Sequence, residues 1–216
     1  KRFRRMNLIH LIQKKIGTNK KIRILEIGTG EGRLLMELRK EFPNVEMHGI
    51  NKEPWLAMKG TKSLVKTALF YNILSRAQVN KIKLPSIHFC DAQKIPFPSN
   101  YFDFIISQVS FQHIERKDRA IEEAWRTLKV GGTALINLDY YNSEYPTFMR
   151  PPIPRFVVLN EQRNISIRTI FHNKMNKSIK FETIKMRHSI ITNITMQKDA
   201  KKIFRLGLKY VPDRSF

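Results

Sequence analysis

The stretch Ile24 to Leu35, which reads ILEIGTGEGRLL, constrains the fold of this chain more than any other feature. Its first part is a short apolar run, partly β-branched, of the kind that forms a buried parallel strand. Gly28, Gly30 and Gly32 follow at once, and glycine permits a positive φ and a close approach of ligand to backbone. The leucines after the turn fall at helical spacing, so the free N–H groups of a helix face the turn. The stretch predicts a cradle for a nucleotide-like cofactor.

An acid, Glu26, lies just before the first glycine of this turn. The dinucleotide-binding fingerprint has the same glycine spacing but usually follows apolar residues. A carboxylate beside a pyrophosphate is repulsive, whereas it attracts a cation. The acid therefore favours S-adenosylmethionine, which carries an ammonium and a sulfonium but no phosphate, over NAD. The alternative for this motif alone is a loop that only turns the chain.

Strand-like and helix-like segments alternate from this motif to Asp139. The expected strands, beside the first, are Val45 to Asn51, Ser86 to Asp91 and Phe102 to Ser107. Ala120 to Asp139 predicts a helix with Ala124 and Leu128 on one face, a stop at Gly131 and Gly132, and another strand. Such alternation predicts an α/β fold with a doubly wound, mostly parallel sheet whose ligand lies at the carboxyl ends of the strands.

Four ordered motifs between residues 22 and 139 resemble the class I S-adenosylmethionine-dependent methyltransferases, especially the subgroup of the quinone-biosynthesis C-methyltransferases. They are LEIGTGEGRLL, GIN, CDAQKIPFPSNYFDFIIS and EEAWRTLKVGG. The resemblance implies a seven-stranded Rossmann-like sheet with an antiparallel C-terminal edge. It divides the chain into a basic N-terminal helix or extension (1–21), a cofactor-binding core (22–149) and a basic part that completes the sheet and the substrate side (150–216).

The resemblance also assigns cofactor contacts by position. Glu26 is expected to fix the methionine end, and the glycines to line the methionine and ribose. Asp91 is expected to accept from the adenine amine, and Ser107 to lie over the reactive methyl. The full set of expected cofactor-binding residues is Glu26, Gly28, Thr29, Gly30, Gly32, Asn51, Lys52, Asp91, Ala92, Ser107 and Gln108.

Asn51 departs from the family pattern, which usually has an Asp or Glu accepting from both ribose hydroxyls. An amide oxygen accepts one such bond without charge, so cofactor binding is expected to weaken by about 1 kcal/mol. Glu53 substitutes in part if the loop curls back. Asn51 also keeps open the alternative of a methyltransferase fold retained for binding alone.

Few residues near the expected methyl position offer chemistry. A sulfonium methyl needs chiefly alignment and, for some acceptors, a base. His113 is the candidate base, and the alternative is a helix-start histidine that contacts cofactor or backbone. The candidate substrate contacts are Phe111, Gln112, Tyr140 and Tyr141. Ordinary packing is the alternative for the two tyrosines.

Several functions are disfavoured by what the sequence lacks. The Asn/Asp-Pro-Pro-aromatic motif of amino-group nucleic-acid methyltransferases is absent where the chain reads SQVSF, and the single cysteine, Cys90, is poorly placed as a nucleophile. No Cys/His cluster has metal-ligand spacing, so no metal is expected. One cysteine forms no internal disulfide, which fits a reducing compartment inside the cell: the cytoplasm, or a mitochondrion if a targeting segment preceded Lys1. No run approaches the length of a membrane span.

The net charge of +22 is unevenly placed. Residues 1–25 hold 9 bases and no acid, residues 150–216 hold 15 bases and 4 acids, and the centre holds 16 and 14. Basic flanks favour a polyanionic partner, RNA or a ribonucleoprotein; lysines scattered by coding bias are the alternative. The sequence thus predicts a methyltransferase that leans toward an RNA acceptor. A small-molecule methyltransferase and a non-catalytic assembly factor remain as alternatives.

The part after Asp139 is less informative. Tyr140 to Arg155 is aromatic and proline-rich, as expected of a loop that covers a substrate or of a stiff connection. Four more strands are expected, at Phe156 to Leu159, Ile165 to Ile170, Ile179 to Met186 and Ser189 to Thr195. A basic helix is expected over Lys198 to Tyr210.

Overall fold

The computed structural model describes residues 8–17, 21–54, 58–108, 110–111, 114, 117–141, 178–185 and 189–199 of the 216-residue chain. Within these residues, five helices precede or separate the strands: α1 (Leu8–Ile16), α2 (Arg33–Glu41), α3 (Ser63–Phe70), α4 (Arg76–Val79) and α5 (Lys117–Thr127). The strands are β1 (Arg23–Ile27), β2 (Glu46–Asn51), β3 (Ser86–Phe89), β4 (Phe102–Ser107), β5 (Leu128–Tyr141), β6 (Ile179–Lys185) and β7 (Ser189–Gln197).

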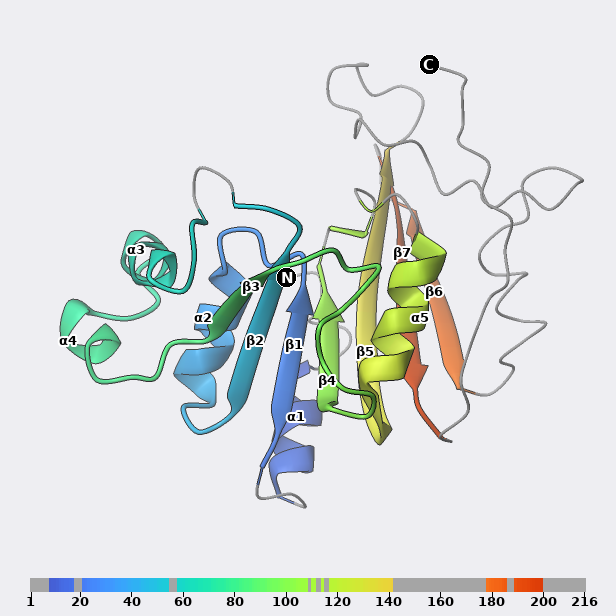
Figure 1. Cartoon of the computed structure of the whole chain (residues 1–216), viewed down its shortest axis with the longest axis horizontal. Coiled ribbons are helices and arrows are strands. Elements are labelled where there is room, and N and C mark those ends of the chain that lie inside the picture. The colour runs from blue at the N-terminus through green and yellow to red at the C-terminus, as the bar shows by residue number, and fades with distance from the viewer. Residues whose placement is uncertain are drawn as a thin grey trace, which may run out of the picture.

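The strands form one sheet in the order β3-β2-β1-β4-β5-β7-β6 (Figure 1). The pairs β1·β2, β1·β4, β2·β3 and β4·β5 are parallel, whereas β7 is antiparallel to β5 and β6. The predicted doubly wound α/β fold with an antiparallel C-terminal edge is therefore confirmed. Because β1 to β4 run in the same direction, the residues that follow them meet at one edge of the sheet, where the glycine turn lies.

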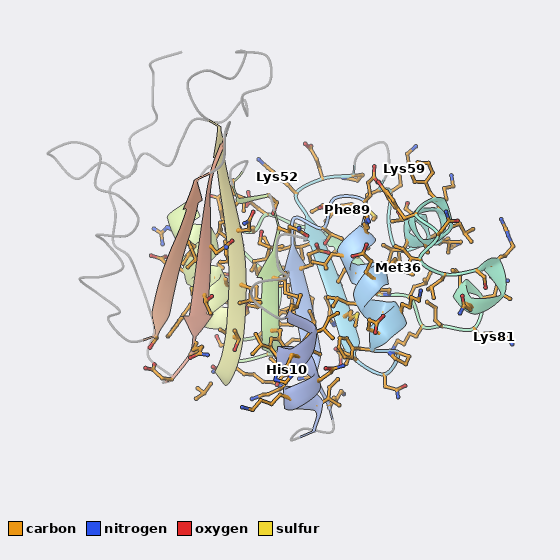
Figure 2. All side chains as sticks on the ribbon, turned by 180° about the vertical axis from the view of Figure 1, so that it is seen from behind. His10, Met36, Lys52, Lys59, Lys81 and Phe89 are labelled. Atoms are coloured by element: carbon orange, nitrogen blue, oxygen red, sulfur yellow. The ribbon has the colours of Figure 1, made fainter. Side chains whose placement is uncertain are left out.

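Helices cover both faces of the sheet, and the first strand shows why. Ile24, Leu25 and Ile27 are all buried, as expected for a central parallel strand. Ile24 packs with Ile12 of α1 and Leu35 of α2 on one face. Leu25 and Ile27 pack with α5 on the other face. Figures 1 and 2 show α5 on one side of the sheet and α1 and α2 on the opposite side.

A third apolar cluster supports α3 and α4, which the sequence analysis did not predict. Its buried members include Met36 of α2 together with Met58, Leu64, Ala68, Ile73, Leu74 and Val79. A capping box begins α4, since the Ser75 hydroxyl accepts from Gln78 N while the Gln78 side chain accepts from Ser75 N. Residues 58–85, called the α3–α4 lobe below, thus form a unit packed against one edge of the sheet.

The predicted helix stop at Gly131 and Gly132 is wrong. Helix α5 ends at Thr127, and Leu128, predicted on the helix face, opens β5. Gly131 has φ 74° and lies where the β4·β5 register shifts. A Cβ at Gly132 would lie 2.8 Å from Lys129 O. The two glycines therefore serve a strand irregularity that brings backbones close together, rather than a helix end.

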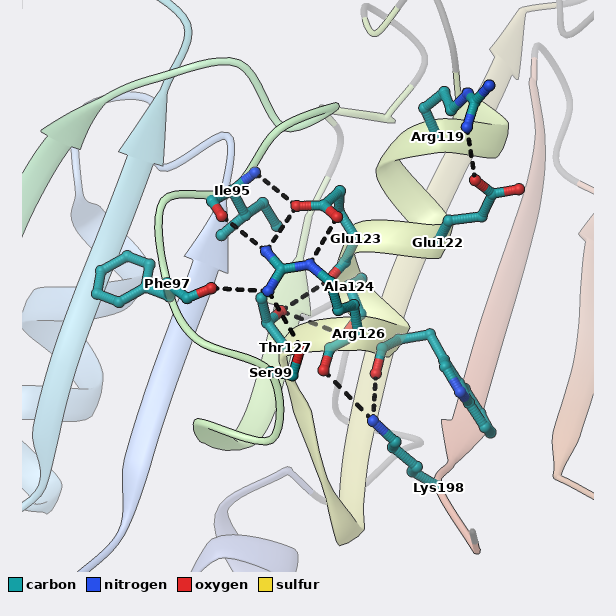
Figure 3. A network of polar contacts seen from close by, with 11 residues as sticks. Ile95, Phe97, Ser99, Arg119, Glu122, Glu123, Ala124, Arg126, Thr127 and Lys198 are labelled. Atoms are coloured by element: carbon teal, nitrogen blue, oxygen red, sulfur yellow. Dashed lines mark hydrogen bonds and ion pairs between the residues drawn. The ribbon is translucent and has the colours of Figure 1, made fainter. Parts of the chain in front are cut away.

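The end of α5 is closed by a lysine from the far end of the chain. Lys198 Nζ donates to Trp125 O and Leu128 O, each at 2.8 Å, and to Arg126 O at 3.3 Å (Figure 3). Burial, followed by the charge of Arg126, lowers the pKa of Lys198. Lys198 is not helical, so the predicted start of the basic helix is wrong at this residue. Residues 200–210 of that prediction, and the strands predicted at 156–159 and 165–170, lie outside the described residues.

The remaining strand predictions are confirmed with small shifts of their ends. The strands predicted at Ile179 to Met186 and Ser189 to Thr195 are β6 and β7. The strand predicted to reach Asp91 ends at Phe89. The predicted N-terminal helix exists over Leu8–Ile16, and its Leu8 and Ile12 are buried against the sheet. The division into three parts at 21 and 149 stays a prediction.

Candidate functional site: the glycine turn and the strand ends around it

The glycine turn between β1 and α2 is built on positive φ angles. They are 71° at Gly28, 55° at Gly30 and 78° at Gly32, which L side chains rarely adopt. Gly28 N and Thr29 N both donate to Ile50 O, at 2.9 and 3.1 Å. The turn is thereby fastened to the carboxyl end of β2, beside the next residue of interest, Asn51.

The three glycines of the turn differ in what surrounds them. A Cβ at Gly28 would lie 2.2 Å from Ser110 Cβ, and one at Gly32 would lie 2.2 Å from Leu64 Cδ2. At Gly30 nothing among the described residues lies within 4 Å of such an atom. Gly28 and Gly32 are therefore required by packing within the protein. The space beside Gly30 is open to a ligand.

Asn51, predicted to face the ribose, is bound to the turn itself. Its Oδ1 accepts from Gly30 N at 3.1 Å, and its Nδ2 donates to Gly30 O at 3.2 Å. Both halves of the side-chain amide are thus used by one residue of the turn. Only an amide provides a donor and an acceptor in this arrangement, since a carboxylate has no hydrogen to donate.

Glu26 is a buried carboxylate that lacks a full set of partners. The residue is 4% exposed, and its Oε2 has no hydrogen-bond partner among the described residues. Burial, and to a smaller degree the charge of Glu37, raise the pKa of Glu26 well above its usual value. Such a group is costly when charged and unpaired. A cation brought into the turn would offset that cost, which is the fit expected for an ammonium group.

Thr29 and Ser107, both predicted to contact the cofactor, point into the protein. Thr29 is 5% exposed, and its hydroxyl occupies the space that a Cβ at Gly49 would need, 2.3 Å away. Ser107 is fully buried, and its hydroxyl donates to Ile27 O at 3.0 Å. Both hydroxyls bond carbonyls of β1 and so help to hold the turn. The predicted contacts of these two residues with a cofactor stay predictions.

Ser110, which the sequence analysis did not single out, is the residue that covers Gly28. Its hydroxyl donates to Ile27 O at 2.8 Å and lies 2.7 Å from the Ser107 hydroxyl. Phe111, predicted to contact substrate, is fully buried in the core on the α5 face, and its contact with a substrate stays a prediction. The signal that could have identified Ser110 is its spacing of three from Ser107 after a strand.

Asp91 follows β3 and is held by its neighbour Gln93. Asp91 Oδ1 accepts from Gln93 N at 2.9 Å, and Oδ2 accepts from Gln93 Nε2 at 3.1 Å. Ala92 is buried beside it. Each carboxylate oxygen keeps a second lone pair for a ligand. Asp91 is only half-buried, so it remains available for the expected contact with an exocyclic amine.

An ion pair on α5 fixes the loop that carries Asp91. Arg126 donates to Ile95 O and Phe97 O, each at 2.8 Å, and to Glu123 (Figure 3). Glu123 in turn accepts from Ile95 N at 2.8 Å. These contacts with Ile95 and Phe97, three in all, join the loop after β3 to α5. The loop after β3 is thus positioned from the α5 side of the sheet.

Cys90, which precedes Asp91, is a poor nucleophile in this setting. Burial, followed by the charge of Asp91, raises the pKa of the Cys90 thiol to about 11. The thiolate is the reactive form of cysteine, so a raised pKa keeps the side chain inert at neutral pH. This agrees with the expectation from sequence that Cys90 is a poor candidate for a nucleophile.

The structure describes only some of the remaining predicted site residues. Gln108 is half-buried at the end of β4, and Lys52 is exposed just after β2 (Figure 2). His113 and Gln112 lie outside the described residues. Tyr140 and Tyr141 end β5, and their side chains are not among those described. The candidate base and these substrate contacts therefore stay predictions.

Comparison with protein families decides the class of this fold. The family model described as a methyltransferase domain matches residues 25–136, just over half of the chain. This chain belongs to the methyltransferase domain family. The matched part begins in β1 and ends in β5, so it contains the glycine turn, Asn51, Asp91 and the end of β4. The resemblance stated from the sequence motifs is confirmed.

Curated relatives of this methyltransferase domain match over short stretches. The ubiquinone/menaquinone biosynthesis C-methyltransferase UbiE of Cupriavidus metallidurans is 36% identical over 58 residues, 27% of this chain and 24% of the relative. The protein of the same name from Bordetella parapertussis is 45% identical over 47 residues, 22% of this chain and 18% of the relative. The chain thus spans about a quarter of these relatives or less.

Solved structures share the fold at low identity. Haemonchus contortus phosphoethanolamine N-methyltransferase 2, in complex with S-adenosyl-L-methionine, has a TM-score of 0.55 and 17% identity, covering 83% of this chain and 49% of that one. YcgJ from Bacillus subtilis has a TM-score of 0.51 and 16% identity, covering 83% and 93%. The [4+2]-cyclase SpnF has a TM-score of 0.54 and 14% identity, covering 83% and 76%. A cyclase among them illustrates that fold alone does not fix the reaction.

The described part of the methyltransferase domain lacks two further features, a membrane-spanning helix and a cluster of metal ligands. No helix there is long and apolar enough to cross a membrane. No group of three or more His, Cys, Asp and Glu side chains there is arranged to hold a metal ion.

The sequence analysis also missed the contacts that hold the outer side of the glycine turn. Thr67 Oγ1 of α3 donates to Glu31 O at 2.7 Å, and Tyr71 OH donates to Glu31 Oε2 at 2.7 Å. The Arg33 guanidinium lies 4.6 Å from the centre of the Tyr71 ring. The spacing of four between Thr67 and Tyr71 places both on one helix face, a signal that was available in the sequence. The methyltransferase domain therefore grips its turn from both β2 and α3.

Proposed function

We propose that this protein binds S-adenosylmethionine at the glycine turn and transfers its methyl group to an acceptor. The proposal rests on the buried Glu26 carboxylate, which lacks a full set of partners and belongs to the strand that leads into the glycine turn, and on the free space at Gly30 in that turn. When bound, the cofactor supplies a methyl group on a sulfonium that is already activated for in-line displacement. The protein then has to bind, orient and exclude water, and these tasks fall to the turn and the strand ends.

Each end of the cofactor has a candidate partner in the chain. Glu26 would neutralise the ammonium, and the open face of Gly30 would take the sugar at van der Waals distance. Asp91 would accept from the adenine amine with the lone pairs that Gln93 leaves free. Asn51 would keep the turn in shape while these contacts form. No metal ligand is needed in this scheme, since the leaving group requires no Lewis acid.

A small molecule is the acceptor that we propose first. Its support is the similarity to UbiE proteins, which are named for ubiquinone and menaquinone biosynthesis. RNA or a ribonucleoprotein is the second candidate, and the charge of +22 with its basic flanks favours it. A non-catalytic scaffold is the third, motivated by Asn51.

Calorimetric titration of the purified protein tests the proposal. S-adenosylmethionine and S-adenosylhomocysteine are titrated with and without total RNA at two salt concentrations. Micromolar binding of both ligands is expected, and a folded protein that binds neither would overturn the enzyme proposal. Transfer of a labelled methyl group to a small-molecule extract, with none to RNA, is expected for the first acceptor. The reverse pattern would establish the second, and binding without any transfer would establish the scaffold.

A further inference from the structure

The α3–α4 lobe carries positive charge without any compensating acid. Residues 58–85 contain six bases and no Asp or Glu. The six are Lys59, Lys62, Lys66, Arg76, Lys81 and Lys83, and all are exposed. Figure 2 shows Lys59 and Lys81 pointing away from the protein at two ends of the lobe. This surface differs from the basic flanks that the sequence analysis identified, because it lies inside the nearly neutral centre of the chain.

The six bases of the lobe have no carboxylate partner among the described residues, whereas several bases elsewhere in the described chain do. Arg33 pairs with Glu37 at 2.8 Å, Arg126 with Glu123 at 2.7 Å, and Lys129 with Asp103 at 2.7 Å. No carboxylate among the described residues lies within ion-pair distance of the six lobe bases. Their charge is therefore available to an external anion.

An exposed aromatic ring continues the basic stripe on α3. Lys62, Lys66 and Phe70 are spaced by four residues, which puts them on one face of the helix. Phe70 is 78% exposed, and its ring packs edge-on against Tyr71 with centroids 5.0 Å apart. The opposite face of α3 buries Leu64 and Ala68, so the stripe faces solvent. A phenylalanine this exposed leaves its ring face free for a flat partner.

We propose that the α3–α4 lobe binds single-stranded nucleic acid. Its lysines and arginine meet backbone phosphates, and Phe70 stacks on a base. Cations that track a backbone together with an aromatic platform are the combination by which proteins hold single strands without reading sequence. The proposal does not depend on cofactor binding or on methyl transfer, so its failure leaves the proposed function untouched.

An anionic membrane is the competing partner for a basic surface, and the lobe fits it less well. Helices that lie in a membrane interface bury a broad apolar face. Phe70 is the only large hydrophobic side chain of the lobe that is exposed. The remaining large apolar residues of the lobe are buried or half-buried in its own core. A single ring surrounded by lysines suits a stacked base better than an acyl layer.

Fluorescence anisotropy with labelled oligouridylate and oligothymidylate tests the proposal over a range of salt concentrations. A chain of charge +22 attracts any polyanion, so a matched control is essential. The test variant is Lys62→Gln/Lys66→Gln. The control is Lys14→Gln/Lys40→Gln, which removes the same charge from exposed positions on α1 and α2. Phe70→Ala tests stacking, with Phe89→Ala on β3 as the exposed aromatic control.

The two test variants are expected to weaken nucleic-acid binding in different ways. The Lys62/Lys66 variant lowers the slope of log Kd against log salt by about 1.4, about 0.7 per lost phosphate contact. Phe70→Ala weakens binding at least about fivefold and leaves that slope unchanged. The controls should resemble the parent protein, and thermal unfolding midpoints should agree across all variants.

Three outcomes would overturn the proposal. Equal losses in the test and control lysine pairs would mean that the lobe has no special role. An unchanged affinity in Phe70→Ala would remove the stacking contact. Binding to phosphatidylserine vesicles that depends on Lys62, Lys66 and Phe70, without binding to either oligonucleotide, would assign the lobe to membranes instead.

Discussion

The Asn51 side-chain amide bonds both the N–H and the carbonyl of Gly30, at 3.1 and 3.2 Å. A position expected to serve the cofactor therefore serves the turn that cradles it. An acid at this position could accept from Gly30 N but would set a second negative oxygen against Gly30 O. The Asn51 amide thus holds the turn in place but lacks the charge that an acid would offer to the ribose hydroxyls.

Replacing Asn51 with Asp is expected to separate these two roles. Asn51→Asp should lower the free energy of unfolding by about 1–2 kcal/mol, because one hydrogen bond is lost and a carbonyl is left facing a carboxylate. It should also tighten S-adenosylmethionine binding about tenfold, as a charged acceptor becomes available. Urea unfolding and calorimetric titration measure the two effects. A variant that gains stability and loses affinity would contradict the assignment.

Glu26→Gln is expected to make the protein more stable and to weaken its binding of the cofactor. A buried acid whose pKa is raised stabilises the fold below its unfolded pKa of 4.5, and that stability is lost as pH rises toward the raised value. The glutamine should therefore raise the free energy of unfolding at neutral pH and remove this loss.

The effect of Glu26→Gln on ligand affinity is tested with a control ligand. Affinity for S-adenosylmethionine should fall about tenfold to a hundredfold, as expected for a lost contact to a charged group. Methylthioadenosine lacks the amino acid end, so its affinity should not change. Equal losses for both ligands would place the effect of Glu26 away from the ammonium.

Alanine at two glycines of the turn should have unequal costs. Gly30→Ala has room for its Cβ and should cost about 1–2 kcal/mol for the positive φ alone, while blocking the cofactor. Gly28→Ala adds a collision with Ser110 and should cost more in urea unfolding. Because Ser110→Gly by itself loses the hydrogen bond to Ile27 O, the double variant Gly28→Ala/Ser110→Gly is compared with Ser110→Gly and should cost only about 1–2 kcal/mol more, the cost of the positive φ alone. Equal stability of Gly28→Ala and Gly30→Ala would show that Ser110 yields freely.

Acid stability should depend on Glu46 at the start of β2. Burial by itself would raise its pKa, but hydrogen bonds from His48, Tyr101 and Arg23 outweigh burial and bring the pKa to about 2. The stability this gives is complete above the unfolded pKa of 4.5 and is lost as pH falls toward 2. Glu46→Gln should lower stability at neutral pH and flatten that acid-dependent loss in urea unfolding. Glu41→Gln, on the exposed end of α2, should leave the pH profile unchanged.

The strands and the turn could be predicted from the sequence, because buried parallel strands and glycine-rich turns have recognisable local sequence patterns. Ile24 to Ile27 needed no tertiary information to be recognised, and the family motifs supplied the order of the strands. The end of α5 was missed because Gly131 and Gly132 look the same in a helix stop and in a strand irregularity. What decides between them is a register shift against Phe102 and Phe104, a contact between distant parts of the chain.

Side-chain roles at the site were less predictable than the site's location. The positions of Ser107 and Thr29 in the family motifs predict contacts with the cofactor. In the structure, both hydroxyls bond backbone carbonyls of β1. Only the packing of Thr29 against Gly49, and of Ser110 against Gly28, shows which residues turn inward. The orientation of these side chains depends on neighbours that are remote in sequence, so it cannot be predicted from the spacing of residues in a motif.

Glu31 lies between the two ligand surfaces discussed above. Its carbonyl is held by Thr67 and its carboxylate by Tyr71, both carried by the helix that presents Lys66 and Phe70. Two ligands that both prefer this arrangement of Glu31 must each raise the affinity of the other by the same factor. Such a shared preference would join the glycine turn and the α3–α4 lobe by a reciprocal thermodynamic linkage through Glu31.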